Sequence, residues 1–457
     1  MNPAPTPAPV QWNNRALFYL LWPLIIEQIL MVTMGIADTV MVSFVGEHAV
    51  SGVSLVDVIN NLLILTFAAL GTGGAVVVSQ YIGRRDTKSS ATAARQLIYT
   101  NGIISLVITI ATLILHTGIL RLVYGNAAPD VMKAAQTYFW ITALSYPFLA
   151  LYNSAAALFR AMGNSRVPML IALLVNAINI GGNAVFIFGF HIGVAGAGLA
   201  TLLSRGAAAA ILLSMLIAGS YRSSPASLKG ITTFRLEPRM IHNILNIGIP
   251  SGVENSMFQF GKIMVSRIFT SFGTAAIAAN AITSSINSLF FMPGQAFGLA
   301  ILTVIGQYIG AGDYKEAKGY TVKILKLCYA TLIALTAFIF IFADPLIGLF
   351  HLSDEAHGLA KSYILAYCIA APIFWPLAFT LPNALRAAGD ARYCMVVSII
   401  TMWLVRVSAA YCLAYPLGFG SVGAWMAMGL DFVARAAFYT TRWVRGKWQE
   451  KRVISGQ

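Results

Sequence analysis

The chain has 457 residues, of which 58% are hydrophobic and 10% are charged, and its formal net charge is +14. Soluble domains are usually about a quarter charged, so this composition excludes an ordinary water-soluble protein. Residues 102–120 carry no Asp, Glu, Lys or Arg, and this run reaches the roughly 20 residues that a membrane-spanning helix needs. The chain is therefore predicted to lie within a membrane.

The apolar runs predict the membrane-spanning segments in chain order. Alternating β-barrel segments are absent from the pattern, so helices are expected to satisfy the backbone within the membrane. We predict an all-α polytopic membrane protein with twelve transmembrane helices, at 16–44, 54–80, 95–119, 135–160, 167–190, 194–218, 242–270, 280–308, 321–349, 361–386, 394–416 and 421–443.

The segments outside these spans are short. Residues 1–15 are rich in proline and lack the charged start and small-residue cleavage site of a signal peptide, so they are predicted to be a disordered tail. Residues 219–240 form a basic linker and residues 444–457 a basic C-terminal tail. The two bodies of the chain are then 16–218 and 241–443.

The basic residues are not spread evenly along the chain. Lys and Arg gather in alternate loops and the two tails, for example at 84–95 and in the linker, whereas the loops at 45–52 and 351–358 hold acids. By the positive-inside rule both termini lie in the cytoplasm. The positive charge therefore indicates topology and contact with membrane lipids, and no nucleic-acid partner. Short loops and the absence of an organelle-targeting extension favour the cytoplasmic (inner) membrane of a prokaryote.

The sequence aligns with itself at an offset of 227 residues. Without a gap this register pairs Pro23 with Pro250, Glu27 with Glu254, Gly46 with Gly273, Asn60 with Asn287, and QYIG at 80–83 with QYIG at 307–310. Matches held in one register over such a length predict two repeated six-helix halves. Because each half contains an even number of spans, both halves share one topology and are related by a pseudo-two-fold axis along the membrane normal. Such repeats favour a substrate site between the halves, near the midplane.

One repeated motif lies in a cytoplasmic loop after the fourth helix of each half. It reads RAMGNSR at 160–166 and RAAGDAR at 386–392. Gly163 and Gly389 are expected to end helices as C-caps, and the flanking arginines are expected to lie at anionic lipid headgroups. The motif is therefore predicted to be structural.

Taken together, several segments resemble the multidrug and toxic compound extrusion (MATE) family of secondary antiporters. They are GTGGAVVVSQYIGRRD (71–86) and its repeat AFGLAILTVIGQYIGAGD (296–313), the paired RAMGNSR and RAAGDAR, and MWLVRVSAAY (402–411). The resemblance covers nearly the whole chain after residue 15. It implies twelve helices in two bundles, a working monomer, and export of organic, often cationic, compounds in exchange for inward H⁺ or Na⁺.

Asp38 lies well inside the first span, in GIADTVMVSF. A carboxyl group desolvated at that depth favours its protonated form, so Asp38 could bind and release a proton near neutral pH. The alternative is a structural aspartate bonded to helix polar groups. In the family that this chain resembles, the matching first-helix aspartate is implicated in cation coupling, and the repeat places Val265 at the equivalent position.

Glu27 and Glu254 each follow a helix proline by four residues. Local distortion at the proline gives polar side chains something to bind, so both acids are either scaffolding or candidates for ion coupling that line the cavity. Glu254 resembles the seventh-helix acid that some branches of the family use for cations, although it lies closer to its proline.

Polar residues on other helices are candidates for substrate binding. Asn176, Asn179 and Asn183 share one face of the fifth span by their spacing of three and four. The family often has an acid where this chain has Asn183, and hard cations prefer charged oxygen ligands, so H⁺ is favoured over Na⁺. The remaining candidates are Tyr138, Gln259, Lys262 and Asn287.

The other charges in the spans have simpler interpretations. Asp431 and Arg435 are expected to neutralise each other across one helical turn, and Arg205 and Arg406 are expected to be structural anchors. Lys262 needs a partner at mid-membrane, and we hypothesise that this partner is Asp38.

Two other functional classes compete with antiport. A membrane enzyme would need a catalytic or metal-binding constellation, and the scattered histidines provide no HxxxH or DDxxD motif; without a Walker sequence, ATP cannot be the energy source. We therefore predict no enzyme, no bound metal, and no cofactor apart from the coupling ion. A lipid-linked oligosaccharide flippase of related architecture would need more cations facing the cavity than Lys262, Arg267 and Arg205, and ranks below drug export.

Overall fold

The structure is a computed structural model, and it describes residues 12–454 apart from 126, 220–224, 351 and 452. Within that range every regular element is helical. The first half comprises α1 (Asn14–Ser43), α2 (Glu47–Gly83), α3 (Thr87–Tyr124), α4 (Pro129–Leu144), α5 (Tyr146–Ala161), α6 (Arg166–Asn183), the π-helical turn η1 (Ala184–Gly189) and α7 (Gly193–Ala218).

The second half repeats this order with more interruptions. It comprises α8 (Pro238–Ser271), α9 (Thr274–Gly310), α10 (Tyr314–Ile341), α11 (Ala343–Gly348), α12 (Asp354–Trp375), the π-helical turn η2 (Pro376–Thr380), α13 (Leu381–Ala387), α14 (Ala391–Ile400), the π-helical turn η3 (Thr401–Val407), α15 (Ser408–Ala414), α16 (Gly420–Val444) and the 3₁₀ turn η4 (Lys447–Glu450).

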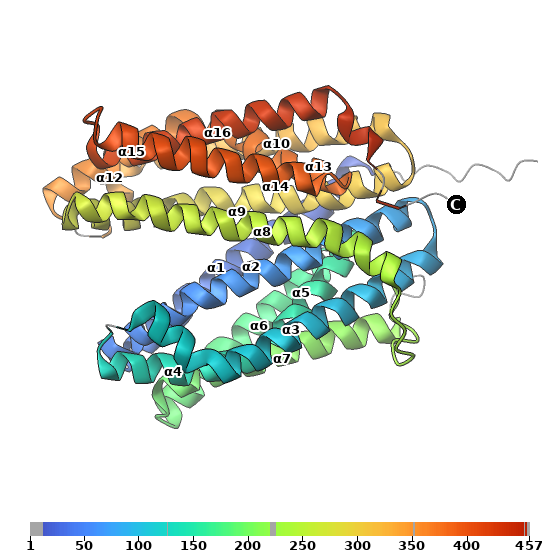
Figure 1. The fold of residues 1–457 in the computed structure, drawn as a ribbon, viewed down its shortest axis with the longest axis horizontal. Coiled ribbons are helices and arrows are strands. Elements are labelled where there is room, and N and C mark those ends of the chain that lie inside the picture. The colour runs from blue at the N-terminus through green and yellow to red at the C-terminus, as the bar shows by residue number, and fades with distance from the viewer. Residues whose placement is uncertain (1–11, 126, 220–224, 351, 452, 455–457) are drawn as a thin grey trace, which may run out of the picture.

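The two halves form two helical bundles. In Figure 1 the ribbons of α1–α7 and α8–α16 come together at one end and diverge toward the other. Among the described residues nine helical segments are long and apolar enough to cross a membrane. The other three predicted spans fall on α4 with α5, which Ser145 separates, and on α8 and α16, which carry several charged residues. The predicted architecture of twelve helices in two bundles is confirmed.

Several helices begin earlier than the apolar runs indicate, because capping residues start them outside those runs. Asn13 accepts a hydrogen bond from the backbone N–H of Ala16 at 2.7 Å, so α1 begins at Asn14. Asp86 caps α3 and Asp313 caps α10 in the same way, at 2.9 and 3.0 Å. The cap at Asn13 shortens the predicted disordered tail of residues 1–15; residues 1–11 lie outside the described part.

The prolines inside the spans redirect backbone hydrogen bonds. Pro23 has no N–H to donate to the Tyr19 carbonyl within α1; the hydroxyl of Ser165 approaches that oxygen at 3.4 Å and donates to the neighbouring carbonyl of Leu20 at 2.6 Å. Pro147 lies at the start of α5, just after the break at Ser145 that divides the predicted span 135–160. At this break the Ser145 hydroxyl accepts a hydrogen bond from Arg205 on α7.

The repeated Arg-x-x-Gly turns occupy equivalent places in the two halves. Gly163 and Gly389 adopt φ values of +79° and +91°, which confirms the predicted left-handed C-caps. Across the contact between the halves, Gln80 donates to the carbonyl of Ala387 at 2.7 Å, and Gln307 donates to that of Ala161 at 2.8 Å. These carbonyls end α13 and α5 and have no helical donor. Each half therefore completes a helix end of the other.

The same contact brings two backbones unusually close. A Cβ atom at Gly83 would overlap the carbonyl oxygen of Gln307, and a Cβ atom at Gly310 would overlap that of Gln80. Small residues allow membrane helices to approach in this way. The QYIG repeat is thus a two-fold symmetric contact between α2 and α9, and it holds the halves together at the end that carries the basic loops.

The described residues nearest the two chain ends, Trp12 and Val453, pack over the repeated turns. The Trp12 indole donates to Gln307 Oε1 at 3.0 Å, its backbone N–H donates to the Tyr308 hydroxyl at 3.2 Å, and its ring lies over Gly163. Val453 lies against Gly389 in the second half. The contact between the halves is therefore covered by segments that the sequence analysis assigned to the tails.

Candidate functional site

The first polar cluster joins α1, α6 and α7 in the first half. Asn183 donates to Asp38 Oδ1 at 2.5 Å, and its amide also reaches Asn179 Oδ1 at 3.4 Å. Asn179 in turn donates to Thr201 Oγ1 at 3.4 Å. The predicted face of asparagines therefore does meet Asp38. Asn176 lies one turn further along and donates to the carbonyl of its own helix at Ala172.

A second acid, Asp57 on α2, belongs to the same cluster. The amide of Asn60 reaches Asp57 Oδ1 at 3.5 Å, and the hydroxyl of Tyr146 donates to Asn60 Oδ1 at 2.7 Å. The predicted candidate Tyr138 is buried and interacts with both Asp57 and Thr201. Sequence reasoning missed Asp57, although an acid inside an apolar span is the same signal that identified Asp38.

The positive charge in this cluster is that of Arg205. Arg205 on α7 donates to the Ser145 hydroxyl at 2.7 Å, at the break between α4 and α5. Its charge acts on both Asp38 and Asp57, so it is part of the acidic cluster as well as an anchor. Among the described ion pairs none contains Asp38, and the hypothesised pair of Asp38 with Lys262 is not formed. Asp38 bonds to α6, whereas Lys262 lines a pocket of the second half.

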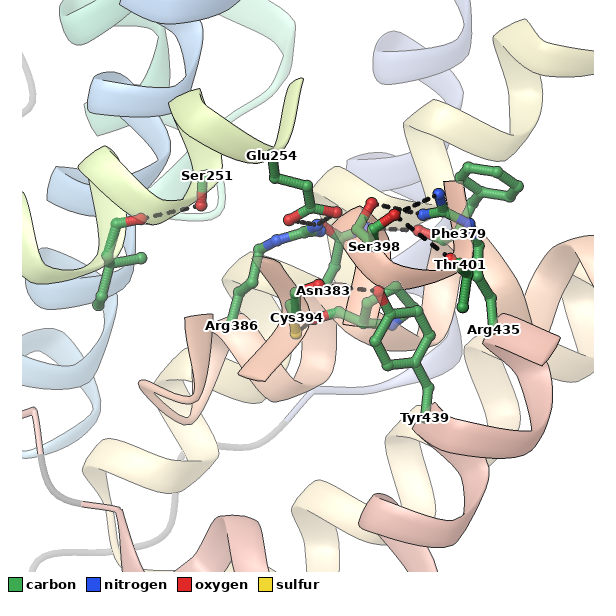
Figure 2. Close-up of polar contacts among 12 residues, drawn as sticks. Ser251, Glu254, Phe379, Asn383, Arg386, Cys394, Ser398, Thr401, Arg435 and Tyr439 are labelled. Carbon is green, nitrogen blue, oxygen red and sulfur yellow. Dashed lines mark hydrogen bonds and ion pairs between the residues drawn. The ribbon is translucent and has the colours of Figure 1, made fainter. Parts of the chain in front are cut away.

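Glu27 and Glu254, the two acids that follow a helix proline, form ion pairs with the first arginine of each repeated turn. Glu27 accepts from Arg160 at 2.7 Å, and both carboxylate oxygens of Glu254 lie 2.7 Å from Arg386 Nη2. Arg386 also donates to Asn383, as Figure 2 shows. The expectation that Arg160 and Arg386 lie at lipid headgroups is wrong, because both form ion pairs with buried carboxylates. These pairs favour a scaffolding role for both acids.

The second half contains a pocket of about 580 Å³ that reaches the first half at Leu65. Its lining includes the predicted candidates Gln259, Lys262 and Asn287. The lining also contains cations that the sequence analysis placed elsewhere, namely Arg386, Arg406 and Arg435. The pocket is therefore lined by polar residues of α8 and α9 and by arginines from three further segments, and Arg406, which was expected to be a structural anchor, is one of them.

Asp431 lies behind this pocket between two arginines. Arg435 donates to Asp431 Oδ1 at 2.8 Å, which confirms the predicted neutralising pair, and to the Ser398 hydroxyl at 2.6 Å (Figure 2). Arg406 Nη1 lies 4.0 Å from the other carboxylate oxygen of Asp431. Arg406 is part of η3, and π-helical turns occur frequently at functional sites. The corresponding span of the first half also contains a π-helical turn, η1, which follows Asn183 directly and lies later in its span than η3 does.

The fold and these clusters define a class of protein. Two repeated bundles of membrane helices, each with ionisable groups held between its helices, are the architecture of a secondary transporter. The MatE family model matches residues 23–185 and again residues 250–412, and the chain belongs to that family, whose members are multidrug efflux transporters. The two matches begin 227 residues apart, which confirms the internal repeat.

Individual relatives are similar over nearly their whole length. The "Uncharacterized transporter YisQ" of Bacillus subtilis is 28% identical over 95% of both chains. The "Probable multidrug resistance protein NorM" of Thermotoga maritima is 26% identical over 97% of this chain and 94% of its own. An outward-facing MATE family transporter of the MOP superfamily superimposes with a TM-score of 0.88 at 21% identity, over 96% of each chain.

Proposed function

We propose that this protein exports organic compounds from the cytoplasm in exchange for protons, with Asp38 as the proton-carrying group. The observation that carries the proposal is the environment of Asp38. Its carboxylate accepts a hydrogen bond from the neutral amide of Asn183, and it has no ion pair among the described residues. A carboxyl group held this way inside a membrane can take up a proton without breaking a salt bridge.

The neighbouring charges favour a proton over a sodium ion. Asp38 and Asp57 together offer carboxylate oxygens, which a hard cation would accept. Arg205 acts on both carboxyls, however, and a fixed guanidinium opposes the arrival of a second cation. The same charge opposes a proton, but a proton needs a single carboxylate oxygen, which burial in the membrane favours in its protonated form, whereas Na⁺ needs several oxygen ligands at once. Asn183, where the family often has an acid, further reduces the charge available to Na⁺.

Export by alternating access fits the contact between the halves. With both termini in the cytoplasm, the contact of Gly83 with Gln307 and of Gly310 with Gln80 closes the cytoplasmic side. Rocking of one bundle against the other would separate this contact and open the cytoplasmic side to substrate. The protein is then a multi-pass protein of the prokaryotic inner membrane that works as a monomer.

The test is ethidium transport by the purified protein in proteoliposomes. We expect an imposed pH gradient to drive transport without Na⁺, and Asp38→Asn to reduce it at least about tenfold, because the neutral amide cannot carry the proton. Asp130→Asn, an exposed acid in the first turn of α4, is the matched control and should transport normally. Transport driven by a Na⁺ gradient and not by a pH gradient would refute the proton assignment.

A lipid-linked oligosaccharide flippase is the second candidate, and one observation favours it. A flippase needs several cations facing the cavity, and Lys262, Arg386, Arg406 and Arg435 all line the second-half pocket. Two of these cations are neutralised by Glu254 and Asp431. Movement of a fluorescent diphosphate lipid by protein that fails to move ethidium under either gradient would select this function.

A further inference from the structure

The charges around the second-half pocket do not balance. Arg386 is paired with Glu254, and Arg435 is paired with Asp431. Arg406 has a single distant carboxylate contact, at 4.0 Å, to the acid that Arg435 already binds. Lys262 has no ion pair or hydrogen bond within the described part of the chain, and the neighbouring charge that acts on it is that of Arg406. Two adjacent cations therefore lack a full countercharge.

Hydrogen-bond donors around the pocket also lack acceptors. Arg406 is 8% exposed, and its Nε has no hydrogen-bond partner among the described residues. A buried donor without a partner is costly and usually marks a site where something else binds. Other residues of the lining also carry buried donors without a hydrogen-bond partner among the described residues. These donors are the Asn287 amide nitrogen, Arg386 Nε, Trp375 Nε1 and Trp425 Nε1.

The rest of the lining is aromatic. Phe258 lies beneath both guanidinium groups, 5.6 Å from Arg406 and 5.3 Å from Arg435. The other rings of the lining belong to Phe269, Phe291, Trp375, Phe379, Trp425 and Phe432. A volume of about 580 Å³ falls in the range of drug-sized ligands. The pocket thus combines a surface for flat rings with uncompensated positive charge.

We infer that this pocket binds the carboxylate of an aromatic organic acid, with Arg406 and Lys262 holding the negative group and the aromatic rings holding the flat body. Arginine is suited to this task because its fork of donors matches a carboxylate. The first half has the opposite character, since Asp38 and Asp57 share one arginine there. The inference rests on the proposed function, and it adds aromatic carboxylates, either anions or zwitterions, to the organic compounds that the protein exports.

The experiment is a comparison of three ligands that share one ring system. 2-Naphthoate is an anion, methyl 2-naphthoate is neutral and 2-naphthylmethylammonium is a cation. Their Kd values are measured by calorimetry on the full-length protein in lipid nanodiscs, with empty discs subtracted. We expect 2-naphthoate to bind at least about tenfold more tightly than the other two, because a tenfold change in Kd is about 1.4 kcal/mol, which is about the extra free energy of a hydrogen bond to a charged group over a neutral one. Equal affinities would overturn the inference.

Two variants locate the anion. Arg406→Gln and Lys262→Met should each raise the Kd of 2-naphthoate about tenfold and so remove its preference over the ester. Asp431 keeps Arg435 in the first variant, and Lys262 has no ion-pair partner among the described residues to lose in the second, so both should fold. Arg267→Gln is the matched control, an exposed cation of the same helix outside the pocket lining. An unchanged preference in both variants would also overturn the inference.

Failure of this inference can be separated from failure of the proposed function. Ethidium transport under a pH gradient reports on the antiporter and on Asp38, whereas the three-ligand comparison needs no gradient. Selective binding of 2-naphthoate by protein that transports nothing would support the anion site and refute antiport. Gradient-driven transport by protein that binds the three ligands equally would support antiport and refute the anion site.

Discussion

Replacing Gly83 with leucine should reduce ethidium transport at least about tenfold and hold the two halves apart at the end that carries the basic loops. A side chain at Gly83 would overlap the backbone carbonyl of Gln307, and backbone in the middle of a packed helix has little room to yield. Overpacking of this kind costs about 1–3 kcal/mol, and the upper end of that range would reduce the population of the closed arrangement roughly a hundredfold. Gly310→Leu should have the same effect, because it overlaps the carbonyl of Gln80.

The opening can be measured directly. Spin labels at the exposed positions 88 and 315, on a background in which Cys412 and the other cysteines are replaced, report the distance between α3 and α10. The distance should lengthen in Gly83→Leu. Gly319→Leu is the matched control, because a Cβ atom added to this helical glycine of α10 would meet no described atom within 4 Å, and it should leave distance and transport unchanged. An unchanged distance in Gly83→Leu would show that the contact tolerates a side chain.

Replacing Arg386 with methionine should destabilise the protein by about 3–5 kcal/mol, because it leaves the buried carboxylate of Glu254 without its partner. Glu254 is 7% exposed, and Arg386 supplies contacts to both of its oxygens. The double variant Arg386→Met with Glu254→Gln removes the charge as well and should recover most of the stability. Thermal unfolding in detergent measures both changes.

The same pair of variants tests the role of Glu254. If Glu254 is scaffolding, the double variant should regain transport together with stability. A double variant that is stable but cannot transport would assign ion coupling to Glu254 instead. The equivalent pair in the first half, Arg160 with Glu27, provides the internal comparison, since it occupies the same place in the repeat.

The repeat explains why the Arg-x-x-Gly turn occurs twice. Each turn supplies an arginine to the acid that follows a helix proline, and a C-cap glycine that ends the helix. Just before that glycine, a carbonyl accepts a hydrogen bond from a glutamine of the other half. The motif therefore joins the inside of one half to the contact between halves. A loop arginine near a membrane surface has two candidate partners, lipid headgroups and a buried acid, and the linear sequence does not distinguish them.

What the sequence alone determined is what depends on composition and on order along the chain. Membrane location follows from the absence of enough charge to face water. The two repeated halves follow from matches in one register, and Asp38 follows from a carboxyl group inside an apolar run. The spacing of the asparagines predicted that they share one helical face. It did not predict that Asp38 is the partner of Asn183 on that face.

Only the tertiary structure decided which side chains share a site, because pairing between helices depends on their rotation and crossing, which local sequence does not encode. It brought Asp57 and Arg205 to Asp38, separated Lys262 from that acid, and assigned Arg160 and Arg386 to the proline acids. It also placed Arg406 beside Lys262 in one aromatic pocket, although the two lie on helices far apart in the chain. Charge within the membrane can be read from sequence, whereas its compensation depends on contacts between distant helices.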